Sequence, residues 1–552
     1  MIQITLENKK IQKVEKGQTI LDYLKKKTPE KELKKYLAAY LDNEVVHLSH
    51  KLKKDHSIKF VTISDLEGLR IYQRSLVFVL ILAVKELFKK KERLQVLHSI
   101  SGGLYCELEI GEPITNEILS KIKKKMADII KKDIPFKRAV LDYEDWIEVF
   151  AKQGSQDKVD LAKYILSPAL SLYSCSWLKE YFYGALVPST GYLKEFDLKY
   201  YPPGFILRHP SQTSVDKIPE FIDQPQLFKI FNEYERWGDI VNVSTVSDLN
   251  REIQNGQISE LIKISEVLHV KKIAYIADKL NELRNTIKLV LIAGPSSSGK
   301  TTFSKRLSIQ LKINGLRPIQ ISLDDYFVDR DKTPLDEKGE HDFEALEAID
   351  IDLFNKHLKD LLKGKEVEIP VYNFKTGSRE WEGHKLKMEE NSVLIIEGIH
   401  GLNPGLTPLI DRKVIFKIYV SALTQLNIDK YNRIPTTDTR ILRRIVRDSL
   451  FRNYSAGQTI NRWPSVRRGE DKYIFPYQEN ADIMFNSALI YEISILKRFA
   501  EQNLRSVTKD NICYSEAKRL LKFLSYFIDI PPTEVPPTSI IREFIGDSSF
   551  HY

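Results

Sequence analysis

The sequence predicts an α/β protein, with a parallel sheet and flanking helices in the C-terminal half and two smaller α+β regions before it. From residue 285, helical stretches alternate with four short apolar runs, KLVLIA, RPIQISL, SVLIIEG and KVIFKIYV. Such alternation is typical of a parallel sheet covered by helices. The first run leads into a loop of small residues and then into a helix-forming stretch. Residues 285–500 are therefore expected to form one domain.

The remaining regions follow from local patterns. Over residues 1–64, the runs MIQITL and KIQKVEK predict a β-hairpin, and Thr19 with Asp22 resembles a helix-start capping box. A second α+β region is expected over 65–225, with helical periodicity at 76–92 and near 115–131. The apolar spacing of ISELIKISEVLHVKKIAYIADKL predicts a helical connector over 226–284.

The C-terminal residues 501–552 are expected to form a helix and a tail. Helical patterns fill 488–503 and 515–528, and the pairs Pro531–Pro532 and Pro536–Pro537 then predict an irregular end.

Composition limits the class of protein. The 552 residues are 42% hydrophobic and 29% charged, as in soluble globular proteins. The longest apolar runs, such as LVFVLILAV at 76–84, are too short to span a bilayer. The N-terminus has no secretory signal pattern. We therefore expect a cytoplasmic protein without a membrane partner.

Two further features of composition are weak signals. The three cysteines, Cys106, Cys175 and Cys513, lack CxxC spacing and are expected to be free thiols. The net charge is +9, and lysine runs at 25–27, 89–91 and 123–125 are interpreted as solvated helix faces. Contact with RNA stays open as an alternative that the charge alone does not favour.

A phosphate-binding motif follows the first strand of the C-terminal half. Residues 294–301 fit G-x-x-x-x-G-K-[ST], between an apolar strand and a helix. Backbone N–H groups of such a loop, together with the helix N-terminus, bind phosphates, while the lysine neutralises their charge. We therefore predict an ATP site made by Gly294, Pro295, Ser296, Ser297, Ser298, Gly299, Lys300, Thr301 and Thr302.

Acids follow two further strands. SVLIIEG ends a strand at Glu397, where a carboxylate suits Mg²⁺ together with the Thr301 hydroxyl. ISLDDYF places Asp324 and Asp325 at the same carboxyl edge of the sheet. Transfer of a phosphoryl group to an alcohol gains from a carboxylate that accepts the hydroxyl proton. The alternative is that the two aspartates only cap a turn.

Residues 288–486 resemble the uridine kinase and phosphoribulokinase family, most closely its uridine–cytidine kinase branch. The resemblance rests on six pieces in order, which are GPSSSGKTT at 294–302, SLDDYF at 322–327, DFEALEAID at 342–350, IPVYNF at 369–374, LIIEGIHGL at 394–402 and DTRILRRIVRD at 438–448.

The resemblance implies a role for each matching residue. Asp324 corresponds to the catalytic base for the sugar 5′-hydroxyl, and it also helps to place Mg²⁺. Glu344 corresponds to an acid that contacts ribose, Tyr372 to a tyrosine of the nucleoside pocket, and Arg379 to a nearby basic residue. The mobile lid of the family supplies arginines that reach the substrate and the phosphates, here Arg444, Arg447 and Arg452.

The sequence departs from the family pattern where the base is recognised. A pocket histidine is replaced by Gly377, and a lid arginine and a pyrimidine-contacting glutamine are replaced by Tyr454 and Arg462. Loss of a polar partner usually removes discrimination between substrates. The uridine preference of the family therefore does not carry over directly.

The front half resembles two modules of threonyl-tRNA synthetases. Residues 1–64 resemble a TGS domain, a small β-grasp module, and 65–225 resemble the second additional domain, which edits mischarged tRNA with an HxxxH and CxxxH constellation. The four matching positions here are Arg74, Phe78, Phe182 and Leu186. Arginine, phenylalanine and leucine do not bind catalytic zinc, so editing is not expected. A scaffold or regulatory role is favoured.

These resemblances extend over nearly the full chain to a group of bacterial nucleoside kinase-like proteins. The function hypothesis is an ATP- and Mg²⁺-dependent nucleoside kinase in which Asp324, Lys300 and Arg447 act on the reacting groups. Two alternatives remain, which are an RNA- or tRNA-binding regulator that uses ATP as a switch and a kinase of another small alcohol. The family often forms dimers or tetramers, which leaves a homo-oligomer open.

Overall fold

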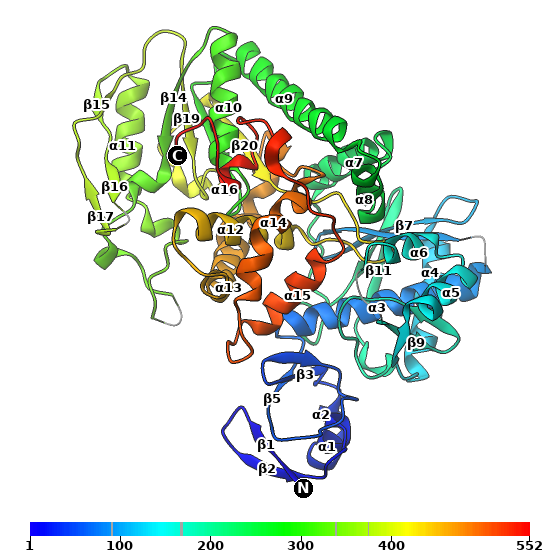
Figure 1. Ribbon diagram of the computed structural model, residues 1–552. Coiled ribbons are helices and arrows are strands. Elements are labelled where there is room, and N and C mark those ends of the chain that lie inside the picture. Colours follow the sequence, from blue (N-terminus) through cyan, green and yellow to red (C-terminus); the bar gives the residue numbers. More distant parts are fainter. Residues whose placement is uncertain (90–91, 166–168, 337–338, 374) are drawn as a thin grey trace.

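The computed structural model describes residues 1–89, 92–165, 169–336, 339–373 and 375–552. Lys90, Lys91 and Phe374, which belong to sequence features noted above, lie outside these ranges. The N-terminal domain stands apart at one end of the molecule, and the domain with the parallel sheet lies at the other (Figure 1). The C-terminus lies beside the parallel sheet, near α10 (Figure 1). Among the described residues, no helix has both the length and the apolar character needed to cross a membrane.

The N-terminal domain is a five-stranded sheet packed against two short helices, in the order β2-β1-β5-β3-β4. The expected hairpin is confirmed, because Ile2 pairs with Val14 in antiparallel register. Thr19 caps the first helix by accepting the N–H of Asp22 at 3.1 Å. The elements are β1 (Ile2–Leu6), β2 (Ile11–Val14), α1 (Ile20–Lys27), α2 (Glu30–Leu33), β3 (Ala38–Leu41), β4 (Glu44–Val46) and β5 (His56–Val61).

The second α+β region is built around one long buried helix, α3. This helix covers an antiparallel sheet of order β11-β12-β7-β6, and a second sheet has the order β10-β9-β8. The elements are α3 (Leu66–Phe88), β6 (Arg93–Ile100), β7 (Gly103–Glu109), α4 (Asn116–Lys131), β8 (Lys137–Asp142), α5 (Tyr143–Lys152), α6 (Gln156–Ala162), β9 (Ala169–Cys175), β10 (Leu178–Glu180), β11 (Asp197–Tyr201) and β12 (Gly204–Arg208). The three cysteines are free and buried, as expected.

Three helices connect the front half to the parallel sheet, as the sequence predicts. They are α7 (Pro225–Ile240), α8 (Val246–Gln254) and α9 (Ile258–Glu282). The expected boundary after residue 500 falls inside a helix, α14 (Glu492–Arg505). The helix expected over 515–528 is shorter, α15 (Tyr514–Leu524), because the chain turns at Ser525 and buries Tyr526 and Phe527.

The C-terminal half contains the predicted parallel sheet, in the order β14-β19-β13-β20-β21. Helices α9 and α10 cover one face and α11 covers the other (Figure 1). The sheet strands are β13 (Leu289–Ala293), β14 (Arg317–Ser322), β19 (Ser392–Glu397), β20 (Ile415–Ser421) and β21 (Ile483–Asn486). The helices are α10 (Lys300–Ile313), α11 (Ile351–Leu362), α12 (Thr436–Phe451), α13 (Ala456–Tyr473) and α16 (Arg542–Ile545). Small strands are β15 (Val367–Glu368), β16 (Val371–Asn373), β17 (Ser378–Glu380) and β18 (Lys385–Leu386).

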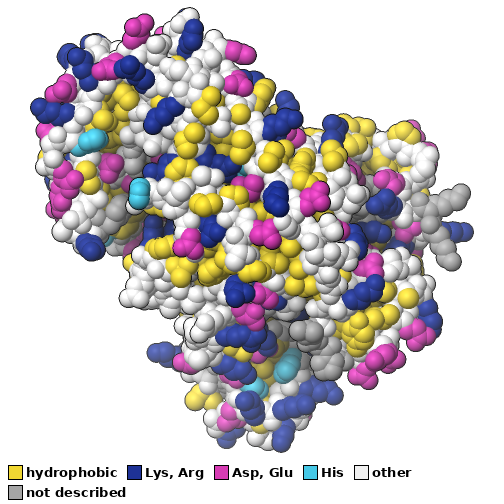
Figure 2. Space-filling view, turned by 45° about the horizontal axis from the view of Figure 1, so that its top comes forward, with side chains coloured by type: hydrophobic (Ala, Val, Ile, Leu, Met, Phe, Trp, Pro, Cys, Tyr) yellow, Lys and Arg dark blue, Asp and Glu magenta, His cyan; other side chains and the backbone are white. Residues whose placement is uncertain are grey.

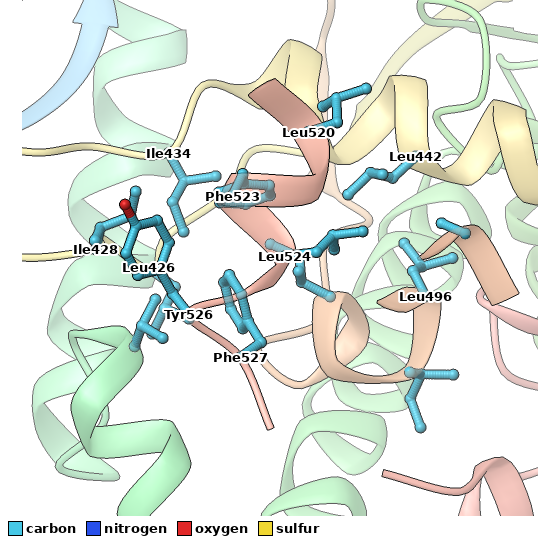
Figure 3. Close-up of a cluster of buried hydrophobic side chains, with 14 of the residues drawn as sticks. Leu426, Ile428, Ile434, Leu442, Leu496, Leu520, Phe523, Leu524, Tyr526 and Phe527 are labelled. Atoms are coloured by element: carbon cyan, nitrogen blue, oxygen red, sulfur yellow. The ribbon is translucent and has the colours of Figure 1, made fainter. Parts of the chain in front are cut away.

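The two halves share buried contacts. One apolar cluster joins the segment before α12 to α12, α14 and α15, with Ile434, Leu442, Leu496 and Phe523 pointing toward one another (Figure 3). Residues of the second region, such as Trp146, belong to the same cluster. The parallel-sheet domain is therefore anchored on the second α+β region.

A fully buried ion network adds a specific link between the halves. The Lys158 ammonium of α6 lies 3.1 Å from the Glu180 carboxylate and 3.7 Å from that of Asp429, which belongs to the segment after β20. The carbonyl of Lys430 accepts the N–H of Val96 at 2.8 Å. Because a buried charge without its partner is costly, this network holds the segment before α12 in a defined place.

Candidate active site

The glycine-rich loop connects the central strand β13 to α10. Gly294 approaches the backbone so closely that a Cβ there would lie 1.9 Å from the carbonyl oxygen of Val420. Gly299 has a φ of +82°, a left-handed conformation that glycine adopts without a steric penalty. The sequence therefore forms the turn that brings backbone N–H groups and the N-terminus of α10 together, as a phosphate site requires.

The serines of the loop are held by the lid helix α12. Arg444 donates to the Ser296 hydroxyl at 2.8 Å, and Arg443 donates to the carbonyl of Ser297 at 3.3 Å. The carbonyl of Ser298 accepts the hydroxyl of Ser487, which follows β21. The loop conformation is thus set by contacts that come from distant parts of the sequence.

Two carboxylates of the protein itself accept hydrogen bonds from N–H and O–H groups of this phosphate site. Glu470 of α13 accepts the N–H of Ser296 at 3.1 Å. Glu543 of α16 accepts the N–H of Thr302 at 3.2 Å and its hydroxyl at 2.6 Å. The Thr302 N–H is one of the donors that the first turn of α10 leaves without a helical acceptor. In this conformation, protein anions lie where a P-loop offers its donors to a nucleotide.

Lys300 lies among three carboxylates. Its charge acts on Asp324, Glu344 and Glu397, and its ammonium is 3.4 Å from the carbonyl of Pro295. Burial raises the pKa of Glu397 to about 7, with Lys300 opposing the rise and Asp324 adding to it. Burial also raises the pKa of Glu344 to about 7, and the neighbouring Glu470 adds to this rise. The surroundings of both glutamates therefore favour the neutral form of the carboxyl group over the charged form.

The donor set fits Mg²⁺. Thr301 donates its hydroxyl to Glu397 at 2.9 Å, and the Asp324 carboxylate is close enough to raise the pKa of Glu397. Hydroxyl and carboxylate oxygens are the ligands that Mg²⁺ prefers, usually one or two of them together with substrate phosphates. Among the described residues, no group of three or more His, Cys, Asp or Glu side chains forms a metal site by itself.

Asp324 stands at the open rim of the sheet, in a short 3-10 turn after β14. Its side chain is exposed, while desolvation by the surrounding protein raises its pKa, and Lys300 and Arg452 oppose this rise. The neighbouring Asp325 has a pKa raised to about 6 by burial, with a hydrogen bond from the backbone of Tyr372 opposing it. Tyr372 is buried, and its ring centroid lies 5.5 Å from that of Phe327.

Arg379 has a different environment from the other predicted residues. Its guanidinium lies 2.9 Å from the Asp350 carboxylate, which caps α11, and it donates to the carbonyl of Phe327 at 3.1 Å. These contacts brace the segment behind Asp324. The substrate-binding role of Arg379 stays a prediction.

The predicted lid arginines gather around one carboxylate. Asp448 lies 3.3 Å from Arg444 and 3.0 Å from Arg447. Arg452 is 3.9 Å from the same carboxylate. Arg444 acts electrostatically on Glu344, and Arg452 acts on Asp324. The structure thus brings the arginine side chains toward the acid cluster, where they can neutralise a transferring phosphoryl group.

Sequence reasoning missed four residues that shape the site, Arg440, Arg443, Glu470 and Glu543. Arg440 and Arg443 belong to the recognised stretch DTRILRRIVRD, and both are buried next to the phosphate loop. Arg440 and Arg443 are three residues apart, so they share one face of the helix, and this spacing could have predicted that both lie at the site. Glu543 lies 241 residues from Thr302 in a segment that sequence reasoning describes only as a tail, and nothing in the local sequence marks it.

The positions that depart from the family pattern have local partners. The Arg462 guanidinium lies 4.5 Å from the centroid of the Tyr454 ring. Gly377 has a φ of +73°, and a Cβ there would lie 2.7 Å from the Arg330 side chain. These substitutions therefore replace hydrogen-bonding groups by a cation–π pair and a tight turn.

The four positions that match the editing constellation in the resemblance lie in packed surroundings. Phe78, Phe182 and Leu186 are buried in one apolar cluster, with the two phenylalanine centroids 5.9 Å apart. Arg74 pairs with Glu67 at 2.5 Å. A cavity of about 70 Å³ remains beside them, and Arg433 of the parallel-sheet domain closes one of its sides.

The fold and site define a P-loop domain of the phosphotransferase type. Residues 289–494 match the model of the phosphoribulokinase / uridine kinase family.

The front half is similar to threonine–tRNA ligases. That of Desulforamulus reducens is 34% identical over 199 residues, which is 36% of this chain and 31% of the ligase. That of Carboxydothermus hydrogenoformans is 31% identical over the same length, again 36% of this chain and 31% of the ligase. The chain thus spans about a third of the length of the curated relatives that it matches.

Solved structures give weaker similarities. A possible uridine kinase from Bacillus stearothermophilus is 19% identical, covers 38% of this chain and 97% of its own, and has a TM-score of 0.26. A D-glycerate 3-kinase from Cryptococcus neoformans is 15% identical, covers 46% of this chain and 87% of its own, and has a TM-score of 0.23.

Proposed function

We propose that this protein transfers the γ-phosphoryl group of ATP to the 5′-hydroxyl of a nucleoside, in an Mg²⁺-dependent reaction. The family match at residues 289–494 supports the reaction class. The observation that carries the proposal is the meeting of Asp324 and Glu397 in the field of Lys300, beside a glycine-rich loop. A protein that only hydrolyses ATP does not need Asp324, whereas transfer to an alcohol does.

Each group of the site has a distinct task in this proposal. Lys300 and the loop N–H groups bind the phosphates, and Asp324 accepts the proton of the attacking hydroxyl. Arg444, Arg447 and Arg452 neutralise the charge that develops on the transferring group. Thr301, Glu397 and Asp324 would hold Mg²⁺, which supplies further neutralisation of phosphate charge when it is bound.

A nucleoside is favoured over other small alcohols by the residues beyond Asp324. Tyr372 is buried next to the segment that carries Asp324 and Asp325, with its ring against that of Phe327. Glu344, with a pKa raised to about 7, suits hydrogen bonds to ribose hydroxyls in either protonation state. Tyr454 and Arg462 leave the base preference open for measurement, with uridine and cytidine as the first candidates.

The test is ATP consumption by the purified full-length chain with Mg²⁺, against a panel of ribonucleosides and deoxyribonucleosides and a control without acceptor. ADP formation that depends on a nucleoside and yields the 5′-monophosphate supports the proposal. ATP hydrolysis that is indifferent to every nucleoside contradicts it.

A negative outcome would favour the alternatives from the sequence, another small alcohol or an ATP-switched RNA-binding regulator. On the face shown in Figure 2, basic side chains lie among acidic and hydrophobic ones. RNA binding with a steep salt dependence would identify the second alternative.

A further inference from the structure

A second cavity lies next to the phosphate loop and is separate from the acid cluster. Its volume is about 390 Å³, within the range of small-molecule sites. The walls come from both halves of the chain: the turn between β6 and β7, helix α7, the end of β20, the start of α12 and the segment before β21. The proposed kinase reaction assigns no role to this space.

The cavity is positively charged. Arg433, Arg440 and Arg467 line it, and the lining includes no Asp or Glu among the described residues. Arg440 and Arg467 pair with Glu470 behind the wall. Among the described residues, no side chain is recorded in a hydrogen bond or close ion pair with the Arg433 guanidinium. Burial lowers the pKa of Arg433, while Tyr183 and the Asp438 carboxylate, which is itself paired with Arg519, oppose this. A partly buried guanidinium whose neighbouring carboxylate is paired with another arginine is a favourable site for a phosphate.

Other lining groups also lack partners. His98 is 4% exposed, and its Nε2 atom makes no hydrogen bond within the described structure, while its Nδ1 atom lies 3.0 Å from the Glu235 carboxylate. The hydroxyl of Ser101 is likewise buried without a partner. Buried polar atoms without partners are rare in folded proteins. A polar ligand in this cavity can supply the missing hydrogen bonds.

Aromatic rings complete the lining. Phe231, Tyr419 and Phe475 face the cavity, and His98 stacks on Phe231 with centroids 4.0 Å apart. Rings of this kind give apolar area to a flat group, while the arginines attract an anion. The ligand chemistry that fits both features is a phosphorylated small molecule with a flat ring.

Arg440 connects this cavity to the phosphate loop. Its Nε atom donates to the carbonyl of Ser296 at 3.0 Å, and it pairs with Glu470, which accepts the Ser296 N–H. An anion that draws Arg440 toward the cavity weakens both contacts. Glu470 then loses one of its two cations and becomes a stronger acceptor for the Ser296 N–H, which opposes a nucleotide phosphate at that donor.

We propose that this cavity is a regulatory site for a small phosphorylated metabolite with a flat ring, and that its occupancy changes the affinity of the phosphate loop for ATP. Because linkage is reciprocal, ATP changes the affinity of the cavity ligand by the same factor.

The test is isothermal titration calorimetry on the full-length chain with four probes: inorganic phosphate, ribose 5-phosphate, UMP and AMP. The background variant Lys300→Ala weakens phosphate binding at the loop itself. Arg433→Met removes the unpaired charge, and Thr437→Phe fills the cavity without changing its charge. Arg498→Met, at an exposed ion pair in α14, is the matched control.

We expect UMP or AMP to bind the Lys300→Ala background more tightly than inorganic phosphate does. Arg433→Met and Thr437→Phe should each weaken this binding at least tenfold, about 1.4 kcal/mol, and Arg498→Met should leave it unchanged. In the chain with Lys300 intact, the same probe should shift the Kd of a non-hydrolysable ATP analogue, and Arg433→Met should abolish this shift. Absence of binding by all probes, or binding that Arg433→Met does not weaken, would overturn the proposal.

Discussion

The contact between Glu543 and Thr302 predicts that the C-terminal segment competes with ATP. The Glu543 carboxylate accepts two hydrogen bonds from Thr302, at 2.6 and 3.2 Å. The Tyr552 hydroxyl lies 2.9 Å from the Thr302 hydroxyl. A phosphate that uses these donors must first displace Glu543. The substitution Glu543→Gln keeps the length of the side chain and removes its charge.

The size of the effect follows from the hydrogen bonds. Bonds to a charged acceptor contribute about 1.5–3 kcal/mol and bonds to a neutral one about 0.5–1.5 kcal/mol. The substitution therefore weakens the internal contact by about 1–1.5 kcal/mol, which corresponds to a Kd for ATP lowered roughly five- to tenfold. Removal of a negative charge beside the triphosphate acts in the same direction.

Titration of a fluorescent ATP analogue measures this Kd directly. Glu534→Gln is the matched control, because Glu534 lies in the same segment and is exposed. Thermal denaturation of both variants verifies that they are folded. An unchanged or weaker affinity in Glu543→Gln would refute the competition, and so would an equal gain in Glu534→Gln.

Three further predictions address the lid, the acid cluster and the link between the halves. Arg447→Ala should lower kcat about 10²–10³-fold by removing charge from the transition state, while Arg498→Ala should not; equal kcat values in steady-state assays would contradict this role. The fold raises the pKa of Glu344 to about 7 from its usual 4.5, so the folded state binds that proton more tightly than the unfolded state, and this stabilisation is lost as pH rises through about 7. Glu344→Gln should therefore raise Tm relative to wild type more at about pH 8 than at about pH 5, and a pH-independent difference in a melting series would argue against it. Lys158→Met leaves two carboxylates buried without a cation and should cost about 3–5 kcal/mol; a loss below about 1 kcal/mol in urea unfolding would show that the network does not hold the halves together.

The parallel sheet could be predicted because its signals are local. Each strand is a short apolar run, and the loop after β13 has glycines at the two positions where a side chain cannot fit or a left-handed φ is needed. The same holds for the hairpin of β1 and β2 and for the Thr19 cap. Local propensity and fold agree at these places.

The acid cluster could be predicted in part. Strand ends place Asp324 and Glu397 at one edge of the sheet, so their meeting follows from the topology. Glu344 lies near them and Lys300 only because of the packing of the irregular segment between β14 and α11. That segment has no helical or strand periodicity that would predict this packing.

The internal anions could not be predicted, because their contacts are long-range. Glu470 reaches Ser296 across 174 residues, and Glu543 reaches Thr302 across 241. Neither glutamate stands out among the charged residues of its own helix. The same applies to Arg433, whose importance depends on a cavity between two regions of the chain.

The central claim is that Asp324 accepts the proton of a nucleoside hydroxyl while ATP donates its γ-phosphoryl group. The most direct test follows labelled γ-phosphate from ATP to the best nucleoside of the panel in the wild type and in Asp324→Asn. We expect label on the 5′-oxygen in the wild type, a loss of transfer of about 10²–10⁴-fold in Asp324→Asn, and similar ATP affinity in both. Label released only as inorganic phosphate, or transfer at the normal rate in Asp324→Asn, would contradict it.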